Sequence, residues 1–224
     1  MRHAILIFAS MAWLAGPGAR YANAQAPAST GGAQTVDGVA ARIEDDILTE
    51  SEVRELGAFQ QLVDGRAKPR DERIRELADQ WILRGEAETA KYPQPAPDDV
   101  SHAYAQLAAQ FASPGEFAHR CAAAGLTEAA VRRMLGQQLY LSRFIDYRFR
   151  PAAQVDQKQV ETYYNTEFAP QLKSRGQPVP PLESVEDTIR EVLIQREISG
   201  RATQWLDETR ERLKIDVMSQ GERP

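Results

Sequence analysis

The sequence predicts a mainly α-helical fold with a small β element that joins the two ends of the chain. Along most of the chain, apolar residues recur every three or four positions between recognisable helix-capping residues, which is typical of packed helices. Two short segments of alternating character lie near the ends, at 36–43 and 215–218. Because neither is long enough to be stable alone, we expect the strand at 39–43 to pair with the strand at 215–218.

A hairpin followed by a helix is expected at the start of this fold. Thr49 and Glu52 form a capping box, in which two side chains satisfy backbone N–H groups at the beginning of a helix. Asp64-Gly65 ends that helix. The expected elements are an imperfect strand at 36–43, a turn at Asp45-Asp46, a short return strand at Ile47-Leu48 and a helix from 49 to about 63.

Further helices follow, most of them bounded by a cap, a glycine or a proline. They are expected at 69–91, 98–112, 113–125, 127–149, 156–168 and 184–214. A Pro-rich connector at 169–182 separates a helical domain at 36–168 from a C-terminal helix and strand at 183–218. We expect this C-terminal part to complete the core.

The first 24 residues have the organisation of a cleaved export signal. A basic start, Met1-Arg2-His3, precedes an apolar run at 4–15 and the small-x-small motif Ala22-Asn23-Ala24. The run is shorter than the roughly 20 residues that span a bilayer, and an uncleaved anchor is the alternative. Cleavage after Ala24 would leave an exported protein that begins with a flexible leader at 25–35.

The charge of the remaining chain disfavours two kinds of partner, nucleic acid and anionic lipid. Because residues 1–24 hold only the basic residues Arg2 and Arg20, the rest carries 25 basic and 32 acidic residues, a net charge of −7. This charge disfavours nucleic acid, whose phosphates require a basic face. It also disfavours attraction to anionic lipid, and no stable membrane insertion is expected.

Aromatic and large apolar residues gather on the helices expected at 127–149 and 156–168. On the first helix they surround the axis, which is typical of a central helix buried on all sides. The alternative is that part of the set lines an open groove, which would offer broad apolar contact to unrelated polypeptides. The candidate polypeptide-binding residues are Tyr140, Phe144, Tyr147, Phe149, Tyr163, Tyr164 and Phe168.

No catalytic residue, cofactor site or metal site is predicted. Cys121 is the only cysteine and is expected to pack between helices, with a reactive thiol or an intermolecular disulfide as alternatives. His102 and His119 lie on different expected helices. The pairs Asp45-Asp46 and Asp98-Asp99 are interpreted as turn and cap residues instead of metal ligands.

Several segments, in their order along the chain, resemble the SurA-type periplasmic chaperones. Residues 36–53 are similar to the family's valine-rich strand, turn and Ile-Thr-x-x-Glu helix start, although Glu44 stands where Asn is usual. Residues 117–132 are similar to its Phe-x-x-x-Leu-x-x-x-Gly-Leu-Thr segment, and residues 155–164 to its Val-Thr-x-x-Glu-Val-x-x-Tyr-Tyr segment. Residues 182–217 resemble its terminal helix and strand.

The resemblance implies a multi-helix SurA/trigger-factor-like peptide-binding domain in a periplasmic, ATP-independent chaperone. Its clients would be unfolded or extended polypeptides, with outer-membrane protein precursors as one class to consider. Relatives insert parvulin prolyl-isomerase domains before the terminal helix, but residues 165–181 are too few for one, so no enzyme activity is expected. The alternatives are an adaptor with one folded partner and an isomerase with an unrecognised site. Client identity and self-association stay open.

Overall fold

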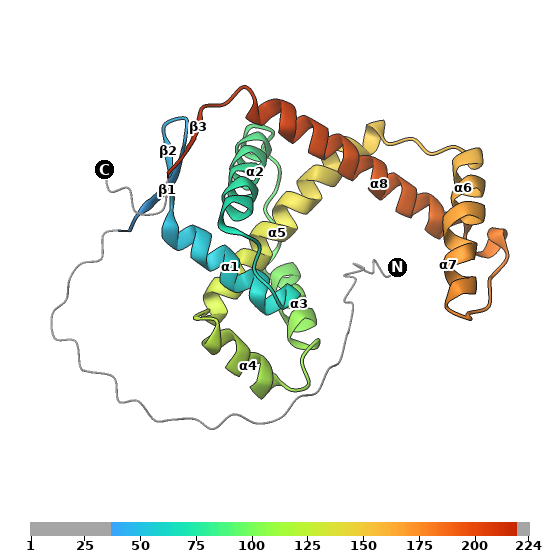
Figure 1. The fold of residues 1–224 in the computed structure, drawn as a ribbon, viewed down its shortest axis with the longest axis horizontal. Coiled ribbons are helices and arrows are strands. Elements are labelled where there is room, and N and C mark those ends of the chain that lie inside the picture. Colours follow the sequence, from blue (N-terminus) through green and yellow to red (C-terminus); the bar gives the residue numbers. More distant parts are fainter. Residues whose placement is uncertain (1–36, 219–224) are drawn as a thin grey trace. The chain divides into compact units, whose positions relative to one another are not determined.

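The computed structural model describes residues 37–218, which form a mainly helical chain with one three-stranded antiparallel sheet (Figure 1). The expected export signal at 1–24 and the leader at 25–35 lie outside the described residues. The chain divides into units at 1–37 and 38–224, and the elements below belong to the second unit.

The two ends of the described chain meet in the sheet, as the sequence predicts. Its order is β2 (Asp46–Thr49), β1 (Val39–Ile43), β3 (Ile215–Val217), and both neighbours run antiparallel to β1. The hairpin turn is Glu44-Asp45, so the expected turn at Asp45-Asp46 is wrong by one residue, because Asp46 already pairs with Ile43. Glu44 takes a φ of 50° at this turn, and its Oε1 accepts a 2.7 Å hydrogen bond from the Lys214 N–H.

Helix α1 (Glu50–Asp64) begins at the predicted capping box. The Glu52 N–H donates to Thr49 Oγ1 over 3.2 Å, and the Thr49 N–H donates to Glu52 Oε2 over 2.8 Å. Gly65 ends the helix with a φ of 73°, a conformation that costs glycine little.

The next helices fall close to their expected places. Helix α2 (Arg70–Thr89) begins just after Pro69, and α5 (Glu128–Phe149) is capped by Thr127 as expected. Helix α3 (Pro97–Ala108) ends four residues before 112, because the N–H groups of Gln110 and Phe111 turn back to nearer carbonyls. Helix α4 (Pro114–Ala123) is capped by Ser113.

The sixth expected helix is longer than the sequence predicts. Helix α6 (Gln157–Tyr163) continues through a π-helical turn (Tyr164–Phe168) into α7 (Ala169–Ser174), so the connector expected at 169–182 is reduced to 175–181. Pro170 does not stop the helix: it lies in the first turn of α7, directly after the π-helical turn.

Helix α8 (Leu182–Arg210) runs from the connector after α7 to strand β3. It begins two residues before the expected Ser184 and ends four before 214. It packs against α6, α5 and α2, and β3 follows it (Figure 1).

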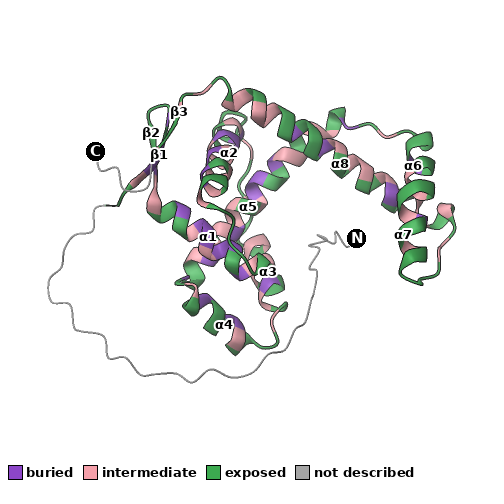
Figure 2. Cartoon of the chain, in the orientation of Figure 1, coloured by how far each residue is buried: buried purple, intermediate pink, exposed green. Residues whose placement is uncertain are grey.

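Three clusters of buried side chains hold the helices and sheet together. Figure 2 colours the buried residues along these elements purple. The first joins α1, α3, α4 and the start of α5, and it confirms the expected packing of Cys121. The second joins the sheet to α1 and α2, and the third joins α2, α5 and the end of α8. The third contains Leu83, Ala87, Tyr140, Leu141 and Phe144.

Candidate functional site

Two of the seven predicted binding residues belong to the core. Tyr140 and Phe144 are 3% and 1% exposed and pack with Leu83, Ala87 and Leu141. Burial raises the pKa of Tyr140, whose hydroxyl donates over 3.4 Å to the Tyr92 carbonyl. For these two residues the structure agrees with a helix buried on several sides, and they offer no surface for a polypeptide.

Tyr147, in contrast, is 61% exposed on the same helix. Its ring lies 5.2 Å from the ring of Tyr92, and Tyr92 lies 5.6 Å from Phe144 and 5.9 Å from Tyr140. We call Tyr92 and Tyr147 the aromatic patch. Tyr147 is exposed and Tyr92 is half-buried, and the pair rests on the buried rings of Phe144 and Tyr140, so the core fixes its position.

Sequence reasoning missed Tyr92, although a signal for it exists. Lys91 has a φ of 52°, the Tyr92 N–H donates to the Ala87 carbonyl, and the Lys91 N–H donates to the Glu88 carbonyl. This pattern is a Schellman motif, in which the residue after the left-handed position commonly makes an apolar contact with the helix. An aromatic residue at this place, just before Pro93, therefore indicates packing back onto α2 and its neighbours.

Ion pairs border the aromatic patch. Arg143, one helical turn before Tyr147, donates to Asp99 of α3 over 2.7 Å. This bond holds the pKa of Asp99 below its ordinary value. Arg148 donates to Glu86 of α2 over 3.0 Å. The patch thus has charged, hydrogen-bonded surroundings and an apolar centre.

Phe149 is turned toward α8 instead of the patch. Its ring lies 5.9 Å from that of Trp205, and the Arg148 guanidinium lies 4.6 Å from the centre of the Trp205 ring. Phe149 is half-buried in this joint between α5 and α8. Its contacts are those of a packing residue.

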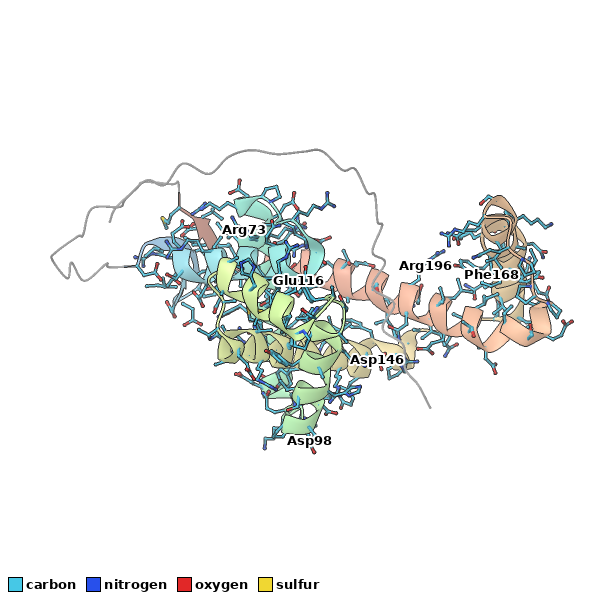
Figure 3. All side chains as sticks on the ribbon, turned by 90° about the horizontal axis from the view of Figure 1, so that it is seen from below. Arg73, Asp98, Glu116, Asp146, Phe168 and Arg196 are labelled. Carbon is cyan, nitrogen blue, oxygen red and sulfur yellow. The ribbon has the colours of Figure 1, made fainter. Side chains whose placement is uncertain are left out.

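Tyr163, Tyr164 and Phe168 lie on a different segment, formed by α6, the π-helical turn and α7. Tyr164 and Phe168 stack with ring centres 6.0 Å apart, and the Tyr164 hydroxyl donates to the Pro180 carbonyl over 2.7 Å. The Arg196 guanidinium lies 5.1 Å from the Tyr163 ring centre. Figure 3 shows Phe168 on this segment and Arg196 on α8. All three aromatic residues are half-buried.

The seven predicted residues therefore do not form one surface. Within residues 37–218, ring contacts link Tyr140, Phe144 and Tyr147 through Tyr92, and separately link Tyr164 with Phe168, but none links the two groups. The aromatic residues of 140–149 and 163–168 are close in the sequence and were therefore predicted to line one surface. In the structure, α8 and the segment 150–156 separate these two groups (Figure 1).

A hollow of about 530 Å³ lies elsewhere, between α2, the end of α8 and β3, and was not predicted. Its volume is in the range of about 300–1,000 Å³ that is usual for ligand sites. Ile74, Ala78, Ile215 and Val217 supply its apolar wall. The charged residues that line it are Asp71, Arg75, Asp207, Arg210 and Glu211.

Most of these charges are paired with one another. Arg210 forms ion pairs with Asp79 and Asp207, and Arg75 donates to Asp207 over 2.7 Å. Burial raises the pKa of Asp79, and its hydrogen bond with Arg210 opposes that shift. Among the described residues, Glu211 forms no ion pair, and Asp71 is highly exposed and its ion pair is a 3.7 Å contact with Arg70. The hollow is therefore acidic at its rim.

The groups usually associated with catalysis are placed as packing or surface residues. Burial raises the pKa of the Cys121 thiol, which disfavours the reactive thiolate. His102 and His119 lie on α3 and α4. Asp98 and Asp99 lie in the first turn of α3, whose cap position is Ala96, so the expected cap role is wrong. Residues 37–218 contain no group of three or more side chains suited to hold a metal.

No protein-family model matches this chain, and no curated protein matches it. Within the described residues, no helix has the length and apolar character required to cross a membrane.

Proposed function

We propose that this protein is an exported, SurA-like chaperone that holds unfolded or extended polypeptides without ATP, a metal or an isomerase domain. The observation that carries the proposal is the aromatic patch. Tyr147 is 61% exposed, yet its ring rests on Tyr92 and on the buried Phe144. Such a ring offers a large apolar contact that loses little conformational freedom on binding.

The chemistry of the patch suits many polypeptides. The exposed Tyr147 ring, beside the half-buried Tyr92, would bind apolar side chains through buried area and impose few directional requirements. The ion pairs Arg143–Asp99 and Arg148–Glu86 are already satisfied, so they do not demand a particular charged partner. The mainly helical fold and the paired terminal strands, which the resemblance implies, add further support.

The test is aggregation suppression by a Tyr147→Ser variant. Because Tyr147 is exposed, the substitution leaves no cavity, and the free energy of unfolding should fall by no more than about 1 kcal/mol. Light scattering of an unfolding client should nevertheless show a clear loss of suppression. Ile47→Ser is the matched control, since Ile47 is 52% exposed on β2 and should leave suppression unchanged. Equal suppression by wild type and Tyr147→Ser would refute the patch.

The same protein preparations separate the alternatives. A chaperone should be trapped with many unrelated unfolded polypeptides, whereas an adaptor should be trapped with one folded protein. An isomerase would make cis/trans exchange of an Xaa-Pro peptide faster than the uncatalysed reaction, which takes tens to hundreds of seconds.

Export is proposed from residues 1–24. The mass of the protein isolated from the cell envelope tests this proposal, because the exported protein should begin at Gln25.

A further inference from the structure

Strand β3 has only one neighbour among the described residues, because the sheet order is β2-β1-β3. An edge strand presents backbone N–H and C=O groups that can pair with an additional strand. The position of β3 is fixed by its surroundings: Arg70 donates to the Met218 carbonyl over 3.2 Å and also pairs with Glu50 at the start of α1. The edge is therefore held firmly in place.

The hydrogen-bond register shows which groups of β3 point outward. The Glu44 N–H donates to the Lys214 carbonyl, and the Met218 N–H donates to the Ala40 carbonyl, both over 2.9 Å. Antiparallel pairs alternate between bonded and non-bonded, so Asp216, which pairs with Arg42, is also bonded to β1. The N–H and C=O groups of Ile215 and Val217 then point away from β1, toward the free edge.

The side chains of the same two residues face the hollow. Val217 pairs with Ala41 and Ile215 with Ile43, and both partners are buried on the face that packs against the helices. Ile215 and Val217 therefore share that face, where they line the hollow with Ile74 of α2. Val217 nevertheless remains 53% exposed. An apolar wall and a row of outward backbone groups thus lie side by side.

We propose that an extended polypeptide segment adds to β3 as a further strand and places alternate apolar side chains in the hollow. The inference rests on the proposed function and specifies how such a protein would hold a client. Backbone hydrogen bonds would supply sequence-independent affinity, and the hollow would select for alternating apolar residues. The acidic residues Asp71 and Glu211 at the rim favour a segment flanked by lysine or arginine.

The test measures binding of a fluorescent peptide of alternating valine and threonine with lysines at both ends. Val217→Pro removes the outward N–H and leaves the Met218–Ala40 bond to β1 in place. We expect its Kd to rise at least about tenfold. The variant's thermal unfolding, which should remain cooperative, shows that the sheet is intact.

Ile47→Pro is the matched control on the other edge. Asp46 pairs with Ile43 next to the two-residue turn, so the Ile47 N–H also points outward, and Ile47 is 52% exposed. Ile47 pairs with the exposed Arg42 and does not line the hollow. Its Kd for the peptide should stay within about twofold of wild type, because only the β3 edge adjoins the hollow.

A charge exchange tests the same site without changing the strand. Glu211 is exposed, so Glu211→Lys should fold normally. It should weaken binding of the lysine-flanked peptide and strengthen binding of a glutamate-flanked one, most clearly at low salt. An unchanged preference would remove the acidic rim from the proposal.

The failure of this proposal can be distinguished from the failure of the proposed function. If Val217→Pro binds the peptide like wild type while Tyr147→Ser loses aggregation suppression, strand addition at β3 is refuted and the chaperone function stands. If wild type suppresses no aggregation but its peptide binding is lost in Val217→Pro, strand addition stands alone. If wild type does neither, both proposals are refuted.

Discussion

Two regions of the protein are stabilised in different ways. The first consists of helices α1–α5 and the sheet, and the second consists of the segment α6–α7. The first region is built around three clusters of buried apolar side chains. In the second, the buried residues of 155–181 are Val160 and Ala169 alone, and α6, which holds Val160, packs on α8. Polar contacts also hold this segment in place. Arg190 donates a hydrogen bond to the Val155 carbonyl, and Arg196 forms an ion pair with Glu167.

The two regions therefore differ in rigidity. A segment with few buried apolar contacts opens more easily than one with a continuous core. The aromatic patch belongs to the rigid region, since the buried rings of Tyr140 and Phe144 support it. Tyr163, Tyr164 and Phe168 belong to the second region, where their half-buried rings have few buried neighbours.

The largest expected effect comes from removing the part of the chain that covers the rigid region. Deleting residues 183–224 removes nearly all of α8 and β3, so Trp205 and Leu206 no longer cover the third cluster and β1 loses a neighbour. Thermal unfolding followed by circular dichroism should lose its cooperative transition. Residues 25–182 melting as sharply and as high as the longer chain would show that α1–α7 fold independently.

The next effect separates core from surface on a single helix. Phe144→Ala removes a ring that is 1% exposed and should cost about 3–5 kcal/mol in denaturant unfolding. Tyr147→Ala, one turn further along, should cost no more than about 1 kcal/mol. Similar losses for both variants would mean that the patch is part of the core.

The smallest expected effect concerns the ion pairs that join α5 to α8. Arg150 of the segment after α5 bonds Asp146 and also Glu191 of α8, and these bonds hold the pKa of both carboxyl groups below their ordinary values of 3.8 and 4.5. A carboxyl group whose pKa is lower in the folded than in the unfolded protein stabilises the folded state at any pH above its unfolded pKa. This stabilisation is lost as the pH falls through its folded pKa.

Acid should therefore weaken this joint, below about pH 4. In an Arg150→Gln variant, the two carboxyl groups lose the partner that lowers their pKa. The free energy of unfolding should therefore fall less steeply than in wild type as the pH is lowered below about 4. Parallel acid profiles for the two proteins would mean that the joint contributes nothing to acid sensitivity.

Local signals in the sequence predicted much of the fold. The capping box at Thr49 and Glu52, the cap at Thr127 and the pairing of the terminal strands are all present. One error arose where the local helix geometry differed from the rule that proline ends a helix. Pro170 did not end the sixth helix, because the π-helical turn before it places the proline in a new first turn.

The candidate site was less predictable, because exposure depends on tertiary packing. Tyr140, Phe144 and Tyr147 look alike in the sequence, yet α2 covers the first two and leaves the third exposed. Tyr92 and the hollow at β3 depend on residues far apart in the chain. For the hollow, residues 71–78 and 207–217 have to meet, and no periodicity within either segment shows that they do.

Site-specific photo-crosslinking tests directly whether Tyr147 contacts unfolded polypeptide. A photoreactive phenylalanine analogue in place of Tyr147 should form adducts with several unrelated unfolded proteins, including an outer-membrane protein precursor. The same analogue in place of the comparably exposed Ile47 should form few. Adducts at 147 with unfolded clients alone are the predicted result. No adducts at 147, or adducts with a single folded protein, would contradict the account.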